Sequence, residues 1–365
     1  MEKTTSGAGG RLEFIDGVRA WAILMMLQVH VIGLTLADRW RDSDSILYAL
    51  WRHTGGAIAS AFLFASGLVV AYLLFKDRGT IDRARLKKYL WRGTQLLLLG
   101  YILQLSPETP VFLFTGDGAF WDWLLHTHVL HAIGVGIFAV TALASLARSV
   151  RWLFPVAALV LMHVCFTVGP IVAVQNELPG VLRIFSSYVL LSQSSFPVLV
   201  WTGFALAGAA MGFLVVAWQL HRRTWVFVIL SVLGYVIRDN SWHILNDTYA
   251  IWWSDHAAWL DYGVFTYYRL GEVLMAVGLI GLLTRFVTLP KAIHASAQET
   301  LGIYFLHSIL VYGSITGFGM DSFLHRNLDP YTSVLLALAV IGLFILYALK
   351  APAIRQRLPF MKYLK

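Results

Sequence analysis

Apolar runs of about 20 residues recur along this chain, and they constrain its fold more than any other feature. A helix of that length spans the hydrocarbon core of a bilayer, where every backbone polar group must be paired within the protein. The chain is 58% hydrophobic and only 13% charged, whereas soluble domains carry roughly 25% charged residues. We expect an all-α, polytopic integral membrane protein with about ten spans, near residues 18–37, 54–75, 89–105, 124–147, 152–172, 196–219, 224–239, 262–284, 299–316 and 332–349.

The positions of the basic residues indicate how these spans are oriented. With a cytoplasmic N-terminus and alternating spans, 21 of the 28 Lys and Arg residues fall in inner segments, six fall in outer loops and Arg269 falls within a span. Because cytoplasmic loops are enriched in Lys and Arg, both termini are expected in the cytoplasm, with 1–17 as a head and 350–365 as a tail of a single domain, 1–365. The net charge of +8 therefore needs no nucleic-acid partner, and the expected partner is the lipid bilayer.

Ionisable side chains at membrane depth are candidates for chemistry, because inserting one costs about 2.5–3.5 kcal/mol or more. The first apolar run carries Asp16 and Arg19 at its entrance and His30 inside it. At about 100° and 1.5 Å per residue, Arg19 and His30 share one helix face and lie roughly 16 Å apart along it. An Asp16–Arg19 ion pair and an inter-helix hydrogen bond from His30 would explain them structurally. Their shared face also allows an anionic ligand at the arginine and a buried base above it.

Two later spans contain further ionisable groups. His307 lies about a third of the way into the ninth span, with Tyr304 nearly one helical turn before it. Arg269 and Glu272 are spaced i,i+3, so they can neutralise one another on one helix face. Each group has a structural explanation, and each is also a candidate for substrate contact or proton transfer.

The outer rim is rich in histidine, tryptophan and acidic residues. His126, His128 and His131 do not share one helix face, so we expect no metal site. His53 lies at the start of the second span, and an aromatic segment follows at 239–259. Tryptophans at this depth commonly anchor a protein at the membrane interface, and a platform for a sugar or lipid headgroup is the alternative.

The inner segment 76–92 carries seven cations. Membrane topology alone accounts for a basic loop on the cytoplasmic side. Arginine also binds phosphate in a bidentate manner and lysine binds it as a point charge. Arg85, Lys88 and Arg92 are therefore candidates for contacts with an anionic, nucleotide-bearing donor.

Several sequence blocks carry a family resemblance. FIDGVRAWAILMMLQVH resembles the opening signature of the transmembrane acyltransferases, the acyltransferase 3 family and its relatives, in which an Asp-Gly-x-Arg motif is followed by a histidine. FLFASGLVVAYLL resembles the second span of that superfamily. FPVLVWTGFALAGAAMG, RLGEVLMAVGLIGLL and SAQETLGIYFLHSILVYG are most similar to the branch of heparan-alpha-glucosaminide N-acetyltransferase-like proteins. The resemblance covers nearly the whole chain.

This resemblance implies acyl transfer across a membrane, here expected to be a bacterial cytoplasmic (inner) membrane. Acetyl-CoA or another acyl-CoA would be the donor, bound from the cytoplasm without a metal, and the acceptor would be a hydroxyl or amine of an extracytoplasmic glycan or glycolipid. Arg19, oriented by Asp16, would hold donor phosphate, and His30 would act as a base or as a transient acyl carrier. His307 and Tyr304 would assist from the facing span. Some members of the superfamily place the essential histidine after the first span, which would correspond to His53.

A different class of protein also buries ionisable residues. A proton-coupled secondary transporter of a small polar solute could use Arg269, Glu272 and His307 as a proton relay. Transporters commonly contain two related halves, and this sequence has no such internal repeat. A non-catalytic membrane scaffold would need no aligned arginine and histidine. The sequence therefore favours the acyltransferase and leaves the transporter as the alternative.

Overall fold

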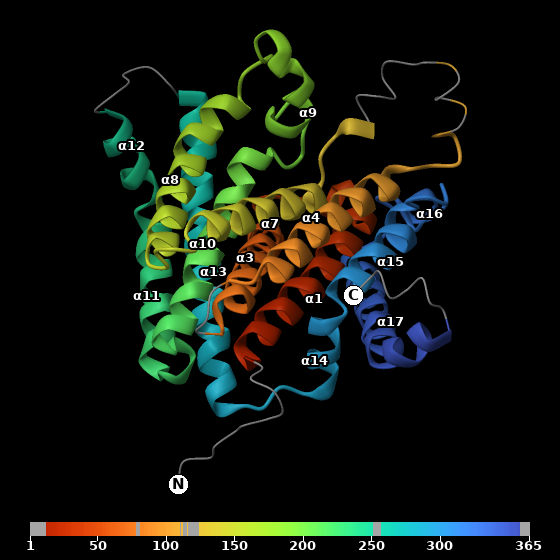
Figure 1. Cartoon of the computed structure of the whole chain (residues 1–365). Coiled ribbons are helices and arrows are strands. Elements are labelled where there is room, and N and C mark those ends of the chain that lie inside the picture. The colour runs from red at the N-terminus through yellow and green to blue at the C-terminus, as the bar shows by residue number, and fades with distance from the viewer. Residues whose placement is uncertain are drawn as a thin grey trace.

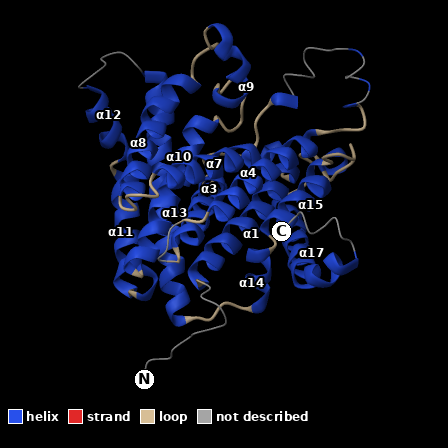
Figure 2. Cartoon of the chain, in the orientation of Figure 1, coloured by secondary structure: helices blue, strands red, loops and turns tan. Residues whose placement is uncertain are grey.

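Helices and the loops that join them form this computed structural model, which describes residues 12–77, 81–109, 111, 115, 124–250 and 257–357. Two isolated bridges, Leu36 with Leu328 and Thr127 with Ser194, are the only β-type pairings among the described residues, and none of these residues forms a strand (Figure 2). The predicted all-α fold class is therefore confirmed. Parts of the predicted head, tail and aromatic outer segment, namely 1–11, 358–365 and 251–256, lie outside the described residues.

Each of the predicted spans coincides for most of its length with one helix of the structure (Figure 1). These helices are α1 (Glu13–Thr35), α3 (Ile58–Phe75), α4 (Arg83–Gln104), α7 (Val129–Leu146), α8 (Leu153–Ala173), α10 (Val198–Trp218), α11 (Thr224–Asp239), α13 (Ala257–Phe286), α15 (Thr300–Tyr312) and α17 (Pro330–Arg357). The connections contain η1 (Asp38–Trp40), α2 (Ile46–Gly55), η2 (Gly180–Phe185), α9 (Ser186–Val189), η3 (Leu220–Arg222), α12 (Ser241–Ala250), α14 (Lys291–Gln298) and α16 (Asp321–Leu324).

Six segments of the described chain are long and apolar enough to cross a membrane. They are Glu13–Thr35, Ile46–Phe75, Val129–Leu146, Leu153–Ala173, Val198–Trp218 and Pro330–Arg357. α15 is a shorter apolar helix of 13 residues. The chain is thus an integral membrane protein, while the number of ten spans stays a prediction.

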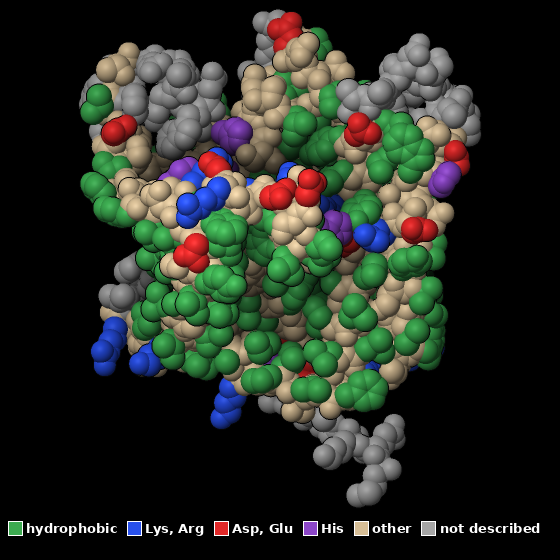
Figure 3. Space-filling view, turned by 180° about the vertical axis from the view of Figure 1, so that it is seen from behind, with side chains coloured by type: hydrophobic (Ala, Val, Ile, Leu, Met, Phe, Trp, Pro, Cys, Tyr) green, Lys and Arg blue, Asp and Glu red, His purple; other side chains and the backbone are tan. Residues whose placement is uncertain are grey.

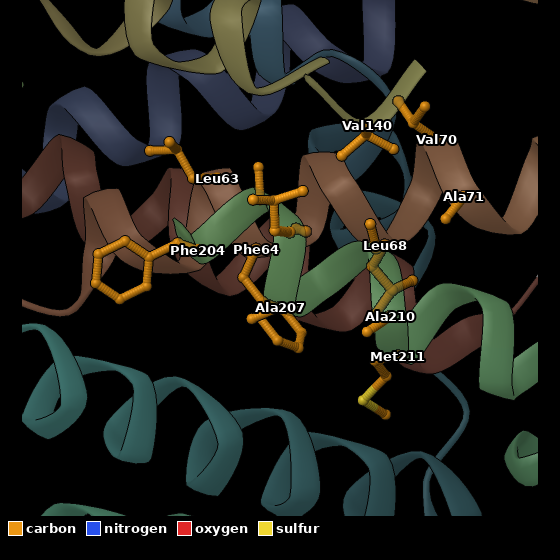
Figure 4. Packing of buried hydrophobic residues seen from close by; sticks show 14 of the residues in the cluster. Leu63, Phe64, Leu68, Val70, Ala71, Val140, Phe204, Ala207, Ala210 and Met211 are labelled. Atoms are coloured by element: carbon orange, nitrogen blue, oxygen red, sulfur yellow. The ribbon is translucent and has the colours of Figure 1, made fainter. Parts of the chain in front are cut away.

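The closest helix packing in the core joins α3 to α10. A Cβ on Gly67 of α3 would lie 1.8 Å from the carbonyl oxygen of Ala205, and a Cβ on Gly208 of α10 would lie 1.9 Å from that of Phe64. Small residues let helix backbones approach in this way in membrane proteins, where van der Waals packing drives helix association. Figure 4 shows the side chains that surround this contact, including Phe64 and Phe204. The backbone contact holds α3 firmly against α10.

α1 lies between two packed groups of helices (Figure 1). Phe14 and Val18, near its beginning, belong to the large apolar cluster that contains α3, α7 and α10. Leu27 and Val31, in its second half, pack in a smaller cluster with α15 and α17. The helix that carries the predicted arginine and histidine is therefore central to the bundle.

The beginning of α1 and the end of α17 lie on the same side of the bundle. Arg19 of α1 contacts Thr300, the first residue of α15, and Arg355 near the end of α17 contacts Glu299, the residue before it. Figure 3 shows a broad hydrophobic belt, with acidic, basic and histidine side chains gathered above it and Lys and Arg side chains at its lower edge. This distribution agrees with the orientation predicted from the basic residues, and a cytoplasmic location of both termini remains a prediction.

Candidate active site

A cavity of about 640 Å³ runs between α1, α3, α4, α7 and α15. Residues from the early part of α1, α4 and α15 line one end of it, namely Arg19, Tyr89, Arg92 and Thr300. Its middle is lined by His30, Tyr304, His307 and Tyr312. Residues at the opposite helix ends line the other end, namely Gln104, His128, Phe196 and Ser314. The cavity therefore extends along the helices between the two sides of the bundle, and it joins a basic end to a histidine-containing centre.

Arg19 and His30 both line this cavity, as their spacing on one helix face predicts. α1 forms a continuous helix from Glu13 to Thr35, so the face they share is maintained from its early part to near its end. Much of the rest of α1 packs into the protein, with Ile23 and Leu27 fully enclosed. The polar pair therefore faces the cavity because the rest of the helix packs into the protein.

His30 and His307 form a hydrogen-bonded pair at the centre of the cavity. Nδ1 of His30 lies 2.9 Å from Nε2 of His307, and Nδ1 of His307 lies 2.5 Å from the backbone carbonyl oxygen of Tyr304. A carbonyl only accepts hydrogen bonds, so Nδ1 of His307 donates to it and the Nε2 atom of the neutral ring accepts from His30. His30 is then protonated on Nδ1, and Nε2 carries its lone pair. This Nε2 atom has no hydrogen-bond partner among the described residues, so it can act as a base or a nucleophile.

The basic end of the cavity contains two guanidinium groups close enough to repel one another, those of Arg19 and Arg92. Arg19 donates from Nη2 to the hydroxyl of Thr300 at 3.0 Å, and Arg92 donates from Nη1 to Oε1 of Gln95 at 3.3 Å. Two cations at the same end of a cavity fit a polyanionic ligand such as a pyrophosphate.

Two buried acidic residues, Asp16 and Glu299, lie near this basic end of the cavity. Asp16 is 5% exposed, and its Oδ2 lies 3.1 Å from Nδ1 of His294 on α14. Glu299 forms a two-point ion pair with Arg355, which fixes the first turn of α15 and thereby the Thr300 hydroxyl that accepts from Arg19. The sequence singled out Asp16 but not His294 or Glu299, because their partners come from helices more than 50 positions away in the chain.

The predicted donor contacts occupy different places. Arg92 lines the cavity, whereas Arg85 and Lys88 do not. Arg85 pairs with Asp77 near the beginning of α4, and Lys88 is exposed. One of the three therefore faces the cavity, and the other two lie at the surface of the same helix.

The predicted substrate contacts also separate into two groups. Tyr304 lines the cavity beside His307, with the two rings 5.1 Å apart. His53, Arg269 and Glu272 contact one another but are not among the cavity-lining residues. The expected Arg269–Glu272 ion pair is present, with Nη1 to Oε2 at 2.6 Å.

Tyr89 and Tyr312 are lining residues that sequence reasoning missed. The ring of Tyr312 lies 5.4 Å from that of His30. Tyr312 follows His307 by five residues, which places it about 140° away around an ideal helix, so no periodic signal connected the two. Tyr89 lies in the basic segment 76–92, where donor contacts were predicted only for Lys and Arg residues.

The three outer histidines have structural contacts. α7 begins at Val129, and the backbone N–H of His128 donates to Nδ1 of His131 at 3.1 Å. His126 accepts from the backbone N–H of Ser195 at 3.0 Å. No group of three His, Cys, Asp or Glu residues within the described part of the chain could hold a metal ion.

Comparison with known families gives a match over more than half of the chain. The model described as heparan-alpha-glucosaminide N-acetyltransferase, catalytic, matches residues 11–240 of this chain. No curated protein and no solved structure matches this chain. The matched region includes Arg19, His30 and Arg92, while Tyr304 and His307 lie beyond its end.

Proposed function

Because the chain belongs to the family of the heparan-alpha-glucosaminide N-acetyltransferase catalytic domain, we propose that it transfers an acetyl group from cytoplasmic acetyl-CoA to an extracytoplasmic acceptor. The acceptor would be a hydroxyl or amine of a glycan or glycolipid, and the enzyme would act in a bacterial cytoplasmic membrane. The observation that carries the proposal is the cavity, which joins the cations Arg19 and Arg92 to the His30–His307 pair.

Donor binding is assigned to the basic end of the cavity. Arg19 and Arg92 would bind donor phosphates through charge-assisted hydrogen bonds, with the hydroxyl of Thr300 holding Arg19 in place. An extended thiol arm would then run along the cavity between apolar side chains such as Leu96 and Val70. This arrangement would bring the thioester to His30, roughly 16 Å along α1 from Arg19. Arg85 and Lys88 would contribute at most a surface contact to the donor nucleotide.

The chemical step is assigned to Nε2 of His30. As a general base, His30 would take the proton of the acceptor O–H or N–H while the acceptor oxygen or nitrogen bonds to the thioester carbonyl carbon. The carbon–sulfur bond would then break, and the proton would pass from His30 to the leaving thiolate. His307 would hold the imidazole of His30 in the required tautomer, and Tyr304 would contact the substrate. An acyl-imidazole formed on the same Nε2 atom is the covalent variant of this route.

The transporter alternative receives less support from the positions of its proposed relay. His307 lines the cavity, whereas Arg269 and Glu272 are not cavity-lining residues. Among the described residues, Glu272 contacts His53, Arg238 and Arg269 and does not contact His307.

The test is an assay of the purified, detergent-solubilised protein with acetyl-CoA and a panel of sugars that end in an amine or only in hydroxyls. We expect release of free CoA thiol that depends on the acceptor, together with an acetylated sugar detected by mass spectrometry. Absence of thiol release with every acceptor, together with solute uptake into vesicles containing the protein, would overturn the proposal in favour of a transporter.

A further inference from the structure

A second cluster of charged side chains lies outside the cavity, between α2, α11 and α13. Nε2 of His53 is 2.6 Å from Oε1 of Glu272, and Nη1 of Arg269 is 2.6 Å from Oε2 of the same carboxylate. Arg238 donates from Nη2 to the hydroxyl of Tyr268 at 2.5 Å, and its Nε lies 3.9 Å from Glu272. We call these five residues the outer network.

The two arginines of the outer network differ in their exposure and in their hydrogen-bond partners. Arg269 is 12% exposed and donates both to Glu272 and to the backbone carbonyl of His53. Arg238 is 32% exposed, and Tyr268 is its hydrogen-bond partner among the described residues. Its guanidinium lies over the ring of Tyr268, 4.7 Å from the centroid, which fixes its plane. Arg238 therefore presents an oriented, accessible fork of N–H donors.

The charges within the outer network do not balance. Two guanidinium groups face one carboxylate, which leaves one positive charge when His53 is neutral. A charge in a membrane protein is costly unless it has a partner or reaches water. The carboxylate of Glu272 is already occupied by Arg269 and His53 at 2.6 Å, while Arg238 is too far for a hydrogen bond to it. The excess charge is thus concentrated on Arg238.

Close contacts at glycines place the network beside the cavity. A Cβ on Gly271 of α13 would lie 2.5 Å from the carbonyl oxygen of Gly234 on α11, so the two backbones touch one turn before Arg238. A Cβ on Gly56 would lie 2.0 Å from Nη2 of Arg269, and the adjacent Gly55 lines the cavity. The outer network therefore lies directly behind one wall of the cavity.

From this geometry we infer that the outer network is a binding subsite for an oxyanion, either a carboxylate or a phosphate. Arg238 binds the anion through its free donors, and Tyr268 holds the guanidinium in the plane that a bidentate contact requires. Arg269 and Glu272 form the fixed support beneath it. The anion is an acidic group of the acceptor, an identification that rests on the proposed function, or a lipid headgroup. Anion binding itself does not depend on acyl transfer.

The test measures binding to the full-length protein without acyl-CoA. Isothermal titration calorimetry with inorganic phosphate and with glucuronate measures the affinity for free anions. Native mass spectrometry after purification from phosphatidylglycerol or phosphatidylcholine nanodiscs detects lipid that stays bound. We expect saturable binding in at least one arm, weakened about tenfold or more in Arg238→Gln, because a hydrogen bond to a charged group contributes about 1.5–3 kcal/mol. The matched control is Arg223→Gln, at the other end of α11, which should bind like the wild type. Arg238→Lys keeps the charge but loses the fork, so it should show an intermediate affinity.

Each outcome decides the inference. Binding of a free anion that is lost in Arg238→Gln identifies an acidic group of the acceptor, and selective retention of phosphatidylglycerol identifies a lipid headgroup. No binding in any arm, or equal binding by Arg238→Gln and the wild type, overturns the subsite. Intact anion binding by a protein that releases no CoA thiol would instead overturn the proposed function and leave the subsite standing.

Discussion

Nδ1 of His30 lies 2.9 Å from Nε2 of His307, although 277 positions separate the two residues in the chain. The backbone carbonyl of Tyr304 fixes the direction of this hydrogen bond, because it can only accept from the other nitrogen of His307. The pair therefore leaves one imidazole nitrogen of known identity, Nε2 of His30, free to react. In the proposed function, His30 is therefore the reacting group and His307 the positioning group, and the two roles are testable separately.

Replacement of His30 by Ala is expected to lower kcat for acyl transfer by about 10²–10⁴-fold, the usual contribution of a general base. The donor phosphates would still reach Arg19, so the Kd for acetyl-CoA should change little. The measurement is release of CoA thiol at saturating donor and acceptor. His163→Ala is the matched control, because His163 is a membrane histidine that contacts Tyr267 and does not line the cavity. Equal turnover by the His30 and His163 variants would exclude His30 from the chemistry.

His307→Ala is expected to lower kcat less than His30→Ala and to leave the KM for the donor unchanged, because His307 acts through His30. Residues that act as a unit are non-additive, so the His30→Ala/His307→Ala double variant should be no slower than His30→Ala. Steady-state kinetics of the three variants checks this. A double variant that loses the product of the two single effects would show that His307 contacts the substrate independently.

The sequence predicted those features that depend on one helix. The apolar runs predicted where helices lie, and the 3.6-residue period placed Arg19 and His30 on one face. The i,i+3 spacing predicted the Arg269–Glu272 ion pair. Each of these relations is local, because the geometry of a single helix determines it.

Relations between helices could not be predicted in the same way. The contact of His30 with His307 depends on how α1 packs against α15, and no periodicity within either helix encodes that packing. The charge of Arg85 and Lys88 made them candidates as strong as Arg92, although α4 turns only Arg92 toward the cavity. Tertiary packing therefore selects one member of a basic segment, and composition alone could not.

Arg19→Gln and Arg92→Gln are each expected to raise the Kd for acetyl-CoA about tenfold or more, because each removes a charge-assisted contact worth about 1.5–3 kcal/mol. Lys88→Gln is the comparison, since Lys88 is an exposed cation of the same helix that does not line the cavity. Its effect should be smaller and should shrink further as salt is raised. Equilibrium binding of the donor measures all three. Equal losses in the three variants would show that general charge attraction, and not the two cavity-lining arginines, binds the donor.

His221, in the connection between α10 and α11, predicts a pH dependence of stability. Burial, with repulsion from Arg222, lowers the pKa of His221 below its ordinary value of 6.5. Between the lowered folded pKa and 6.5 the unfolded state binds more protons than the folded state, so stability falls as the pH falls through this range. The thermal midpoint of the wild type should drop between about pH 7 and about pH 5, and that of His221→Gln should drop less. His325→Gln, which removes an exposed histidine paired with Asp321, should follow the wild type, and identical curves for all three proteins would contradict the assignment.

Gly208→Leu is expected to destabilise the fold, because its Cβ would lie 1.9 Å from the carbonyl oxygen of Phe64 and a backbone atom cannot rotate away. Overpacking of a core typically costs about 1–3 kcal/mol, and here α3 must move as a whole. Gly342→Leu on α17 is the matched control, since nothing lies within 4 Å of a Cβ at that position. In detergent, the thermal unfolding midpoint of Gly208→Leu should be lower than that of Gly342→Leu. Equal midpoints would mean that the α3–α10 contact is not tight. Because Phe62 and Ser66 of α3 line the cavity, displacement of α3 should lower donor affinity in Gly208→Leu as well.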